Sequence, residues 1–250
     1  MRKMKFGIEL EVATSKSKQE VINALSNAGI NVEGSYYGSG VREGVWKVQP
    51  DSSINGWEIV SPPLTDTKDL EVVCHVLRKV VKARSSKKCG LHIHHDINDF
   101  NLEQIKNIYR LYAKYEMNAI HSIQSPHRHN NMYCNPVSPY INRVLSSDTI
   151  EEFKYCIGSR YLNLNHRSYA KFGTIEFRGA QGTVEIDRIL AWLDLTHKLV
   201  ELAEDKEEVK KLHAGRTKEE ALEIMFEELN MEESSRKHYR KVQRYFAKLA

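Results

Sequence analysis

The segment 5–12 alternates apolar residues with glycine and glutamate. Its apolar members are Phe6, Ile8, Leu10 and Val12. A period of two places successive side chains on opposite faces of a β-strand, so the segment predicts a strand with one face in a core. Glu9 and Glu11 then share the other face. Two carboxylates side by side on a half-buried strand repel each other unless a cation or an arginine neutralises them.

Three further stretches repeat this arrangement of polar side chains on predicted strands. They carry His92 and His94 within 90–97, Glu176 and Arg178 within 173–179, and Asp51 and Glu58 on either side of an Asn-Gly turn that joins the strands 44–48 and 57–60. An Asn-Gly pair between apolar runs is a strong hairpin signal. Asp51 and Glu58 lie either across from each other or staggered along one edge.

Each pair taken alone is more typical of a solvated sheet face than of a ligand set. Together they place five carboxylates and two histidines on four strands, which could converge on one concave sheet face. Carboxylates with one or two histidines suit Mg²⁺ or Mn²⁺, and the cysteines, Cys74, Cys89, Cys134 and Cys156, lack the spacing of a structural zinc site. Arg178 beside Glu176 supplies a cation for a phosphate or carboxylate oxygen.

The remaining pattern is mainly helical. Apolar residues at steps of three and four predict helices over 18–28, 67–84 and 101–123, and the chain is mostly helical from residue 184 onward. Asn101 with Gln104 and Thr217 with Glu220 match the capping box that begins a helix. The stretch 125–145 reads as irregular and is either a mobile surface loop or a lid. The order predicts an α+β fold, a single catalytic domain over 1–250 with a helical C-terminal part at about 184–250.

Composition excludes several classes of protein. Hydrophobic residues make up 41% of the 250 and charged residues 28%, which excludes a disordered chain. No run approaches the roughly 18 apolar residues that cross a bilayer, and the N-terminus lacks an apolar signal core, so we expect a cytoplasmic protein without a membrane partner. A net charge of +4 is too mild to indicate a nucleic-acid partner.

The polar strands and their neighbours resemble the amidoligase (carboxylate-amine ligase) family, whose catalytic domain belongs with glutamine synthetase and γ-glutamate-cysteine ligase. Five short motifs between about residues 5 and 182 carry the resemblance, in the order of the family. They are Phe6–Glu11, Asp51–Ile54 followed by Glu58–Pro62, Cys89–His94, the spacing of Asn163 and Asn165 after Arg160, and Thr174–Arg178.

The resemblance implies a curved, mostly antiparallel sheet of the glutamine-synthetase type, with helices on the convex face and ATP and divalent cations on the concave face. Glu11, Asp51 and Glu58 would hold one metal. Glu9, His92 and Glu176 would hold the other, with His94 near the nucleotide phosphates. Arg178 would contact phosphate or stabilise charge in transfer, and Arg160 and Arg167 would bind a phosphate or a substrate carboxylate.

This resemblance predicts an ATP- and Mg²⁺- or Mn²⁺-dependent ligase that joins a carboxylate to an amine through an acyl phosphate. One alternative is a kinase of the same fold, which transfers the γ-phosphoryl group without ligation. The other is a non-enzymatic nucleic-acid-binding protein, which an acidic strand face disfavours. The substrates remain open among small molecules, peptides and proteins, and a monomer or a dimer would both fit.

Overall fold

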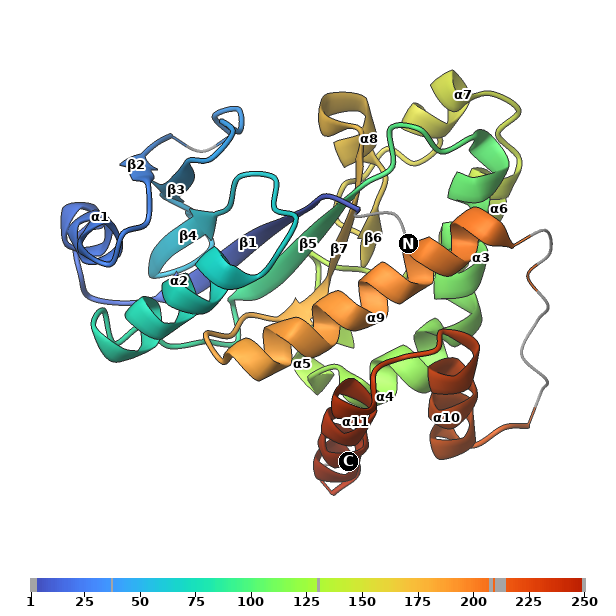
Figure 1. Cartoon of the computed structure of the whole chain (residues 1–250). Helices are drawn as coiled ribbons and strands as arrows, with labels where there is room; N and C mark the ends of the chain where they lie inside the picture. The colour runs from blue at the N-terminus through green and yellow to red at the C-terminus, as the bar shows by residue number, and fades with distance from the viewer. Residues whose placement is uncertain (1–3, 37, 130, 207–208, 210–214, 249–250) are drawn as a thin grey trace. The chain divides into compact units, whose positions relative to one another are not determined.

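The computed structural model describes residues 4–36, 38–129, 131–206, 209 and 215–248. The chain packs as two compact units (Figure 1). The first unit comprises Met1–His95 and Ala180–Ile189, and the second comprises Asp96–Gly179 and Leu190–Ala250. The prediction that residues 1–250 form one domain stays a prediction.

The first unit is built on five strands in the order β2-β3-β4-β1-β5. These are β1 (Phe6–Ala13), β2 (Val32–Gly34), β3 (Trp46–Gln49), β4 (Gly56–Val60) and β5 (Gly90–Asp96). All neighbouring pairs except β2 and β3 are antiparallel. The structure confirms four predicted strands within two residues of their expected bounds, and β2 is an addition that the sequence did not predict.

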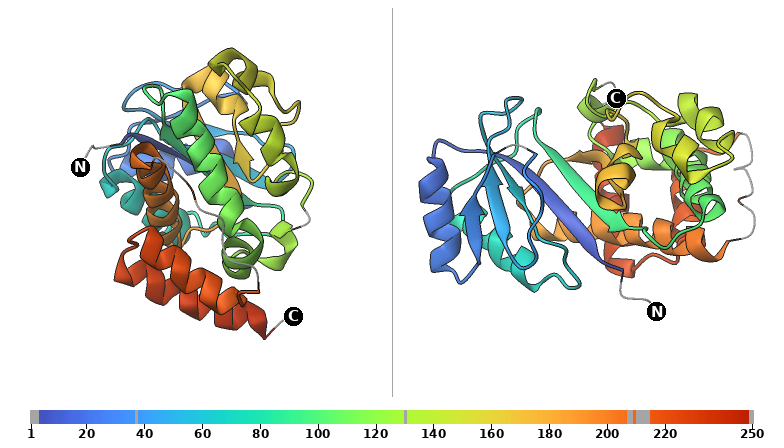
Figure 2. Two further views of the ribbon diagram at one scale, coloured as in Figure 1. Left: turned by 90° about the vertical axis from the view of Figure 1, so that its right-hand side faces the viewer. Right: turned by 90° about the horizontal axis from the view of Figure 1, so that it is seen from above.

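The core of the first unit forms where the alternation predicted it. Ile8, Leu10 and Val12 are each 1% exposed, and Ile59 is fully buried. Helices α1 (Lys18–Asn27) and α2 (Lys68–Lys79) pack against each other, and α1 also packs against β3 (Figure 2). Burial of a large aliphatic side chain contributes about 1.5–3 kcal/mol, so these residues hold the polar strand face in place.

Helix α2 is shorter than the predicted helix over 67–84. It ends at Lys79, and Lys82 has a left-handed backbone with φ of 58°. That conformation cannot continue a right-handed helix. The apolar spacing nevertheless extends past the helix because Val81 and Ala83 are buried in the following turn.

The second unit begins with the predicted helix over 101–123, which the structure confirms with one interruption. The helix consists of α3 (Leu102–Tyr115), a π-helical turn η1 (Glu116–Ile120) and α4 (His121–Ile123). Both capping-box hydrogen bonds between Asn101 and Gln104 are present. A π-helical turn inserts an extra residue into the helical repeat and is often found at functional sites.

The stretch 125–145 is more regular than its composition predicted. It contains α5 (Pro126–His129), η2 (Ser138–Tyr140) and α6 (Ile141–Leu145). Proline is tolerated in the first turn of a helix, and two of the three prolines that suggested a loop, Pro126 and Pro139, lie in the first turns of α5 and η2. Buried Glu116 accepts hydrogen bonds from the amides of Val137 and Ser138, both at 2.7 Å. The role of this stretch as a lid stays a prediction.

The rest of the second unit contains one short strand pair and five helices. The strand pair is β6 (Leu164–Asn165), antiparallel to β7 (Thr174–Gln181). The helices are α7 (Ile150–Tyr155), α8 (Arg167–Phe172), α9 (Ile186–Asp205), α10 (Lys218–Glu228) and α11 (Glu233–Ala247). The end of β7 and the start of α9 belong to the first unit. The sequence predicted β7, the helical C-terminal part and the Thr217–Glu220 capping box, which are confirmed. It did not predict β6, α7 or α8.

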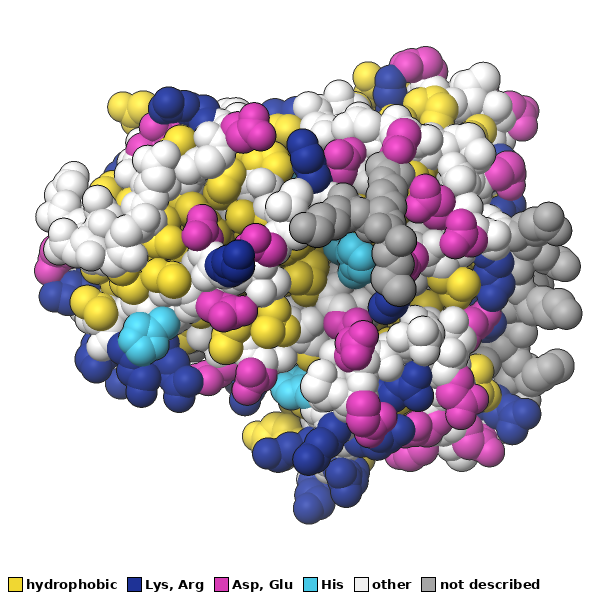
Figure 3. All heavy atoms as spheres, in the orientation of Figure 1, with side chains coloured by type: hydrophobic (Ala, Val, Ile, Leu, Met, Phe, Trp, Pro, Cys, Tyr) yellow, Lys and Arg dark blue, Asp and Glu magenta, His cyan; other side chains and the backbone are white. Residues whose placement is uncertain are grey.

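Basic side chains gather over α11, at the lower edge of the molecule in Figure 3. Arg240 of α11 pairs with Glu223 of α10, while Lys237 and Lys241 are exposed.

The helices of the described residues include none with the length and apolar character of a membrane span. The α+β class and the mostly antiparallel pairing are confirmed, while the curvature of the sheet and its glutamine-synthetase type stay predictions.

The approach of β4 to β1 leaves no room for a side chain at Gly56. A Cβ atom there would lie 2.0 Å from the carbonyl oxygen of Val12. We expect Gly56→Ala to lower the free energy of unfolding by about 1–3 kcal/mol, because the backbone of β1 must move. Gly40→Ala is the matched control, since nothing lies within 4 Å of its Cβ position. Urea denaturation measures both, and an equal effect of the two variants would contradict this account of the pairing.

Candidate functional site

The strand register brings the predicted acidic residues of the first unit onto one face. Glu58 of β4 pairs with Glu11 of β1 on one side and with Gln49 of β3 on the other. Residues directly opposite each other in antiparallel strands point to the same face. Glu9, two residues from Glu11, lies on that face and pairs with His92 of β5.

Glu11, Asp51 and Glu58 form a compact carboxylate group. Each offers one oxygen, and these oxygens lie within 4.8 Å of one another. Glu11 and Glu58 are buried, and Asp51 is half-buried in the turn between β3 and β4. Gln49 is the residue directly opposite Glu58, so Asp51 is staggered from Glu58 by two residues. The turn nevertheless brings the Asp51 side chain to that of Glu58.

Each of these three carboxylates accepts a hydrogen bond from a neutral donor through one oxygen. The amide of Gly90 donates to Oε2 of Glu11 at 2.6 Å, and the amide of Ser53 donates to Oδ1 of Asp51 at 2.7 Å. Gln49 Nε2 donates to Oε2 of Glu58 at 2.5 Å. Within the part of the chain that the structure describes, neither lysine nor arginine pairs with any of the three. The hydrogen bonds orient the carboxylates but leave their negative charge uncompensated by lysine or arginine.

A second group overlaps the first. One ligand atom each of Glu9, Glu58 and His92 lies within 4.8 Å of the others. His92 Nδ1 is 3.0 Å from Oε2 of Glu9 and its Nε2 is 3.6 Å from Oε1 of Glu11. His94 Nε2 is 3.4 Å from the other oxygen of Glu9. Glu58 is therefore shared by two groups, each with an atom set that suits one ion.

The local electrostatics differ between the two ends of this face. Burial opposes the ionisation of Glu9, but hydrogen bonds to His92 and His94 outweigh it and hold the pKa of Glu9 well below its usual range. Burial, and next the charge of Glu9, raise the pKa of Glu58 well above its usual range. The hydrogen bond from Gln49 acts in the opposite direction without cancelling the rise. A cation would relieve this repulsion.

The donor set fits a small, oxygen-preferring divalent cation. Carboxylate oxygens with one imidazole nitrogen suit Mg²⁺ or Mn²⁺, which favour hard oxygen ligands and an octahedral arrangement. The fit rests on the buried, like-charged oxygens of Glu11, Asp51 and Glu58. Two adjacent groups that share Glu58 can serve two ions.

Glu176 lies in the second unit and has a different environment. Arg178 Nη1 is 2.5 Å from Oε1 of Glu176, and Asn165 Nδ2 donates to Oε2 at 2.6 Å. Both oxygens of this buried carboxylate are thus engaged, one of them by a cation. Buried Arg128 donates to the carbonyl of Arg178, in the same strand as Glu176, at 2.6 Å. The assignment of Glu176 as a metal ligand stays a prediction.

Arg160 and Arg167, the predicted phosphate or substrate ligands, are exposed and lie against the loop before α8. The guanidinium of Arg160 lies 5.1 Å from the ring centroid of Tyr161, and Arg167 donates to the carbonyl of Gly158 at 2.7 Å. Their roles with phosphate or substrate stay predictions.

Sequence reasoning missed three groups that orient the site residues. Gln49 and the amide of Gly90 contact carboxylates of the first unit, and Arg128 was assigned to a loop although it is buried. Gln49 could have been found, because it directly follows the predicted strand 44–48 and precedes Asp51 by two residues. The backbone amide carries no sequence signal.

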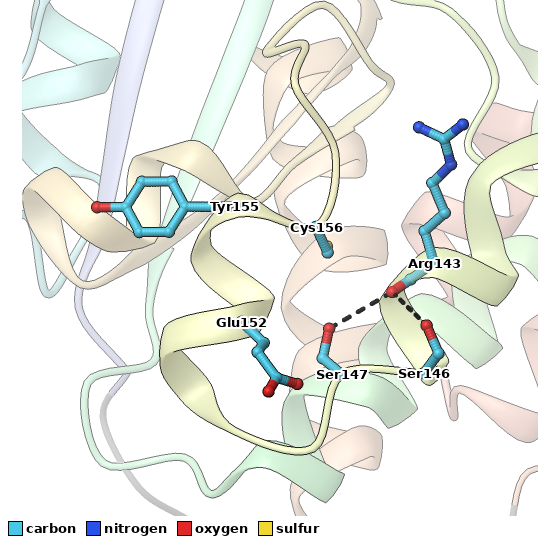
Figure 4. Close-up of a pocket in the computed structure, with 6 residues that line it drawn as sticks. All are labelled: Arg143, Ser146, Ser147, Glu152, Tyr155 and Cys156. Carbon is cyan, nitrogen blue, oxygen red and sulfur yellow. Dashed lines mark hydrogen bonds between the residues drawn. The ribbon is translucent and has the colours of Figure 1, made fainter.

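A hollow of about 360 Å³ in the second unit contains none of the predicted site residues. It is lined by Arg143, Ser146, Ser147, Glu152, Tyr155 and Cys156. The side chains of Arg143 and Tyr155 point away from its centre, and both serine hydroxyls donate to the carbonyl of Arg143 (Figure 4). The polar groups therefore do not converge on a common ligand position.

The raised pKa of Glu58 predicts that its ionised carboxylate lowers the stability of the folded state. A carboxyl with a raised pKa destabilises the folded state above its unfolded pKa, and the penalty disappears at lower pH, where the group is protonated in both states. Without added metal at pH 7, we therefore expect Glu58→Gln to raise the melting temperature, by about 2–4 °C for each kcal/mol regained.

The gain should shrink toward pH 4. Glu223→Gln is the control with the opposite sign, because hydrogen bonds from Arg240 lower the pKa of Glu223 and the substitution removes a favourable charge. Thermal unfolding with a chelator at several pH values measures both variants. A melting temperature of Glu58→Gln below that of the wild type at pH 7 would contradict the raised pKa.

Comparison with known proteins gives a family match for the chain. A family model described as "Putative amidoligase enzyme" matches residues 2–200, which include every residue of both acidic groups. No curated protein matches the chain. The match covers well over half of the 250 residues. The chain therefore belongs to this amidoligase family.

Proposed function

We propose that the protein is an ATP-dependent ligase that uses Mg²⁺ or Mn²⁺ to join a carboxylate to an amine. Membership of the amidoligase family supports amide-bond formation. The observation that carries the metal dependence is the state of Glu11, Asp51 and Glu58, each oriented by a neutral donor through one oxygen. Side chains arranged in this way keep a second oxygen for a cation.

Glu11, Asp51 and Glu58 would hold one ion, and Glu9 and His92 would hold a second with Glu58 shared. Bound there, a divalent cation would neutralise the carboxylates and the triphosphate of ATP and would polarise the γ-phosphoryl group. His94, held beside Glu9, would contact the phosphates. These roles, like the relation to glutamine synthetase and γ-glutamate-cysteine ligase, rest on the motifs in the sequence and on the geometry of the acidic face.

The reaction would proceed in two displacements. A carboxylate oxygen of the first substrate attacks the γ-phosphorus, the bond to the β-phosphate oxygen breaks, and ADP leaves. The amine nitrogen of the second substrate then attacks the acyl carbon, phosphate leaves, and the nitrogen loses a proton. Arg178 would stabilise negative charge on the transferred group, because its ion pair with Glu176 holds the guanidinium in one orientation.

The first test is calorimetric titration of Mn²⁺, and then of a non-hydrolysable ATP analogue with Mn²⁺, into the wild type and Glu11→Gln. We expect the variant to lose metal-dependent nucleotide binding because it removes a charged ligand oxygen. Glu20→Gln is the matched control, since Glu20 lies on the exposed surface of α1. Binding of the analogue without metal, or equal binding by the variant, would overturn the assignment.

Product analysis then separates ligation from phosphoryl transfer. With ATP and pools of carboxylates and amines, a ligase releases free phosphate in proportion to the amide formed, whereas a kinase leaves the phosphoryl group on the acceptor. Binding of nucleic acid that is indifferent to metal and to Glu11→Gln would instead support the non-enzymatic alternative.

A further inference from the structure

Gln49 donates a hydrogen bond to one of the two carboxylate oxygens of Glu58, a proposed metal ligand. We propose that Gln49 is a positioning residue that makes this site selective for small ions such as Mg²⁺ and Mn²⁺ over Ca²⁺. The proposal rests on the proposed function, because it concerns the same acidic group.

The geometry of Gln49 is well defined on both sides of its amide. The residue is 6% exposed at the end of β3, directly opposite Glu58. Its Nε2 donates to Oε2 of Glu58 at 2.5 Å, while its Oε1 accepts from the hydroxyl of Ser35 at 3.3 Å. Ser35 is itself held by its amide, which donates to the carbonyl of Val48 at 3.0 Å. An ionised carboxylate only accepts hydrogen bonds, so Glu58 selects the Nε2 end of the amide, and the Ser35 hydroxyl holds the other end.

This contact occupies Oε2 of Glu58 and leaves Oε1 as the oxygen that can reach a cation. A carboxylate restricted in this way binds through one oxygen. Mg²⁺ requires near-octahedral coordination by six ligands, whereas Ca²⁺ accepts six to eight oxygens and readily takes a carboxylate through both. Release of Oε2 would add a ligand that Ca²⁺ can use and that the smaller ions cannot.

The same restriction applies to the other two carboxylates, but through backbone amides. Gly90 holds Glu11 and Ser53 holds Asp51 by their N–H groups. Substitution cannot remove those donors without a change of backbone. Gln49 is the side-chain donor of the three, so it is the position at which the effect can be measured.

The experiment is calorimetric titration of Mn²⁺ and, separately, of Ca²⁺ into the full chain of the wild type and of Gln49→Met. Methionine has nearly the shape of glutamine and lacks the donor. We expect Mn²⁺ affinity to fall about 10- to 100-fold, as is typical when a group that orients a metal ligand is lost. Ca²⁺ affinity should fall less or rise, so that the ratio of Ca²⁺ to Mn²⁺ affinity increases at least about tenfold.

Two further variants separate this role from a general loss of structure. Gln19→Met makes the same substitution on the exposed face of α1 and should leave both affinities unchanged. Ser35→Ala keeps Gln49 but frees its amide to rotate, so it should change the ratio in the same direction by a smaller factor. Thermal unfolding in a chelator checks that each variant is folded.

The possible outcomes are distinguishable. An equal loss of both metals in Gln49→Met, or an unchanged ratio, would overturn the role of Gln49 while leaving the metal site intact. Failure of the wild type to bind Mn²⁺ would overturn the metal site of the proposed function and the role of Gln49 with it. If Gln49→Met does not fold, an unchanged ratio in Ser35→Ala overturns the selectivity role.

Discussion

Repulsion among buried carboxylates is the constraint on which the rest of the first unit depends. Glu11 and Glu58 lie opposite each other on adjacent strands, and Asp51 approaches them from the turn. Burial of like charges without a cationic partner is costly, and the raised pKa of Glu58 reflects that cost. The apolar face of the same strands supplies the stability that tolerates it, because Ile8 and Leu10 are almost fully buried directly beneath.

Neutral hydrogen-bond donors orient these carboxylates and leave them negatively charged. A lysine or arginine at the position of Gln49 would relieve the repulsion, but it would also compete with a metal for the carboxylate. An amide orients the oxygen without neutralising it. Glu176 in the second unit shows the opposite solution, since Arg178 compensates its charge. The two units therefore show two environments of a buried carboxylate, one hydrogen-bonded by neutral groups and one paired with an arginine.

Local patterns predicted much of the fold. The alternation around Glu9 and Glu11 predicted β1 and its buried face, and the capping boxes at Asn101 and Thr217 predicted where two helices begin. These signals are local, since strand periodicity and N-caps involve residues a few positions apart. Predictions failed where a local pattern had two readings. The prolines of 125–145 suggested a loop, but two of the three lie in the first turns of short helices, and the apolar spacing beyond Lys79 continued into a buried turn.

The sequence by itself determined which residue types form the site, because Glu9, Glu11 and His92 stand out on their strands without knowledge of the partners. Only the tertiary structure decided how they are held. Gly90 contacts Glu11 across 79 positions of the chain, and Gln49 meets Glu58 through the register of β3 and β4. Such contacts depend on strand register, and a shift of one residue would turn every side chain to the other face. The packing of the whole unit sets that register, and no short motif encodes it.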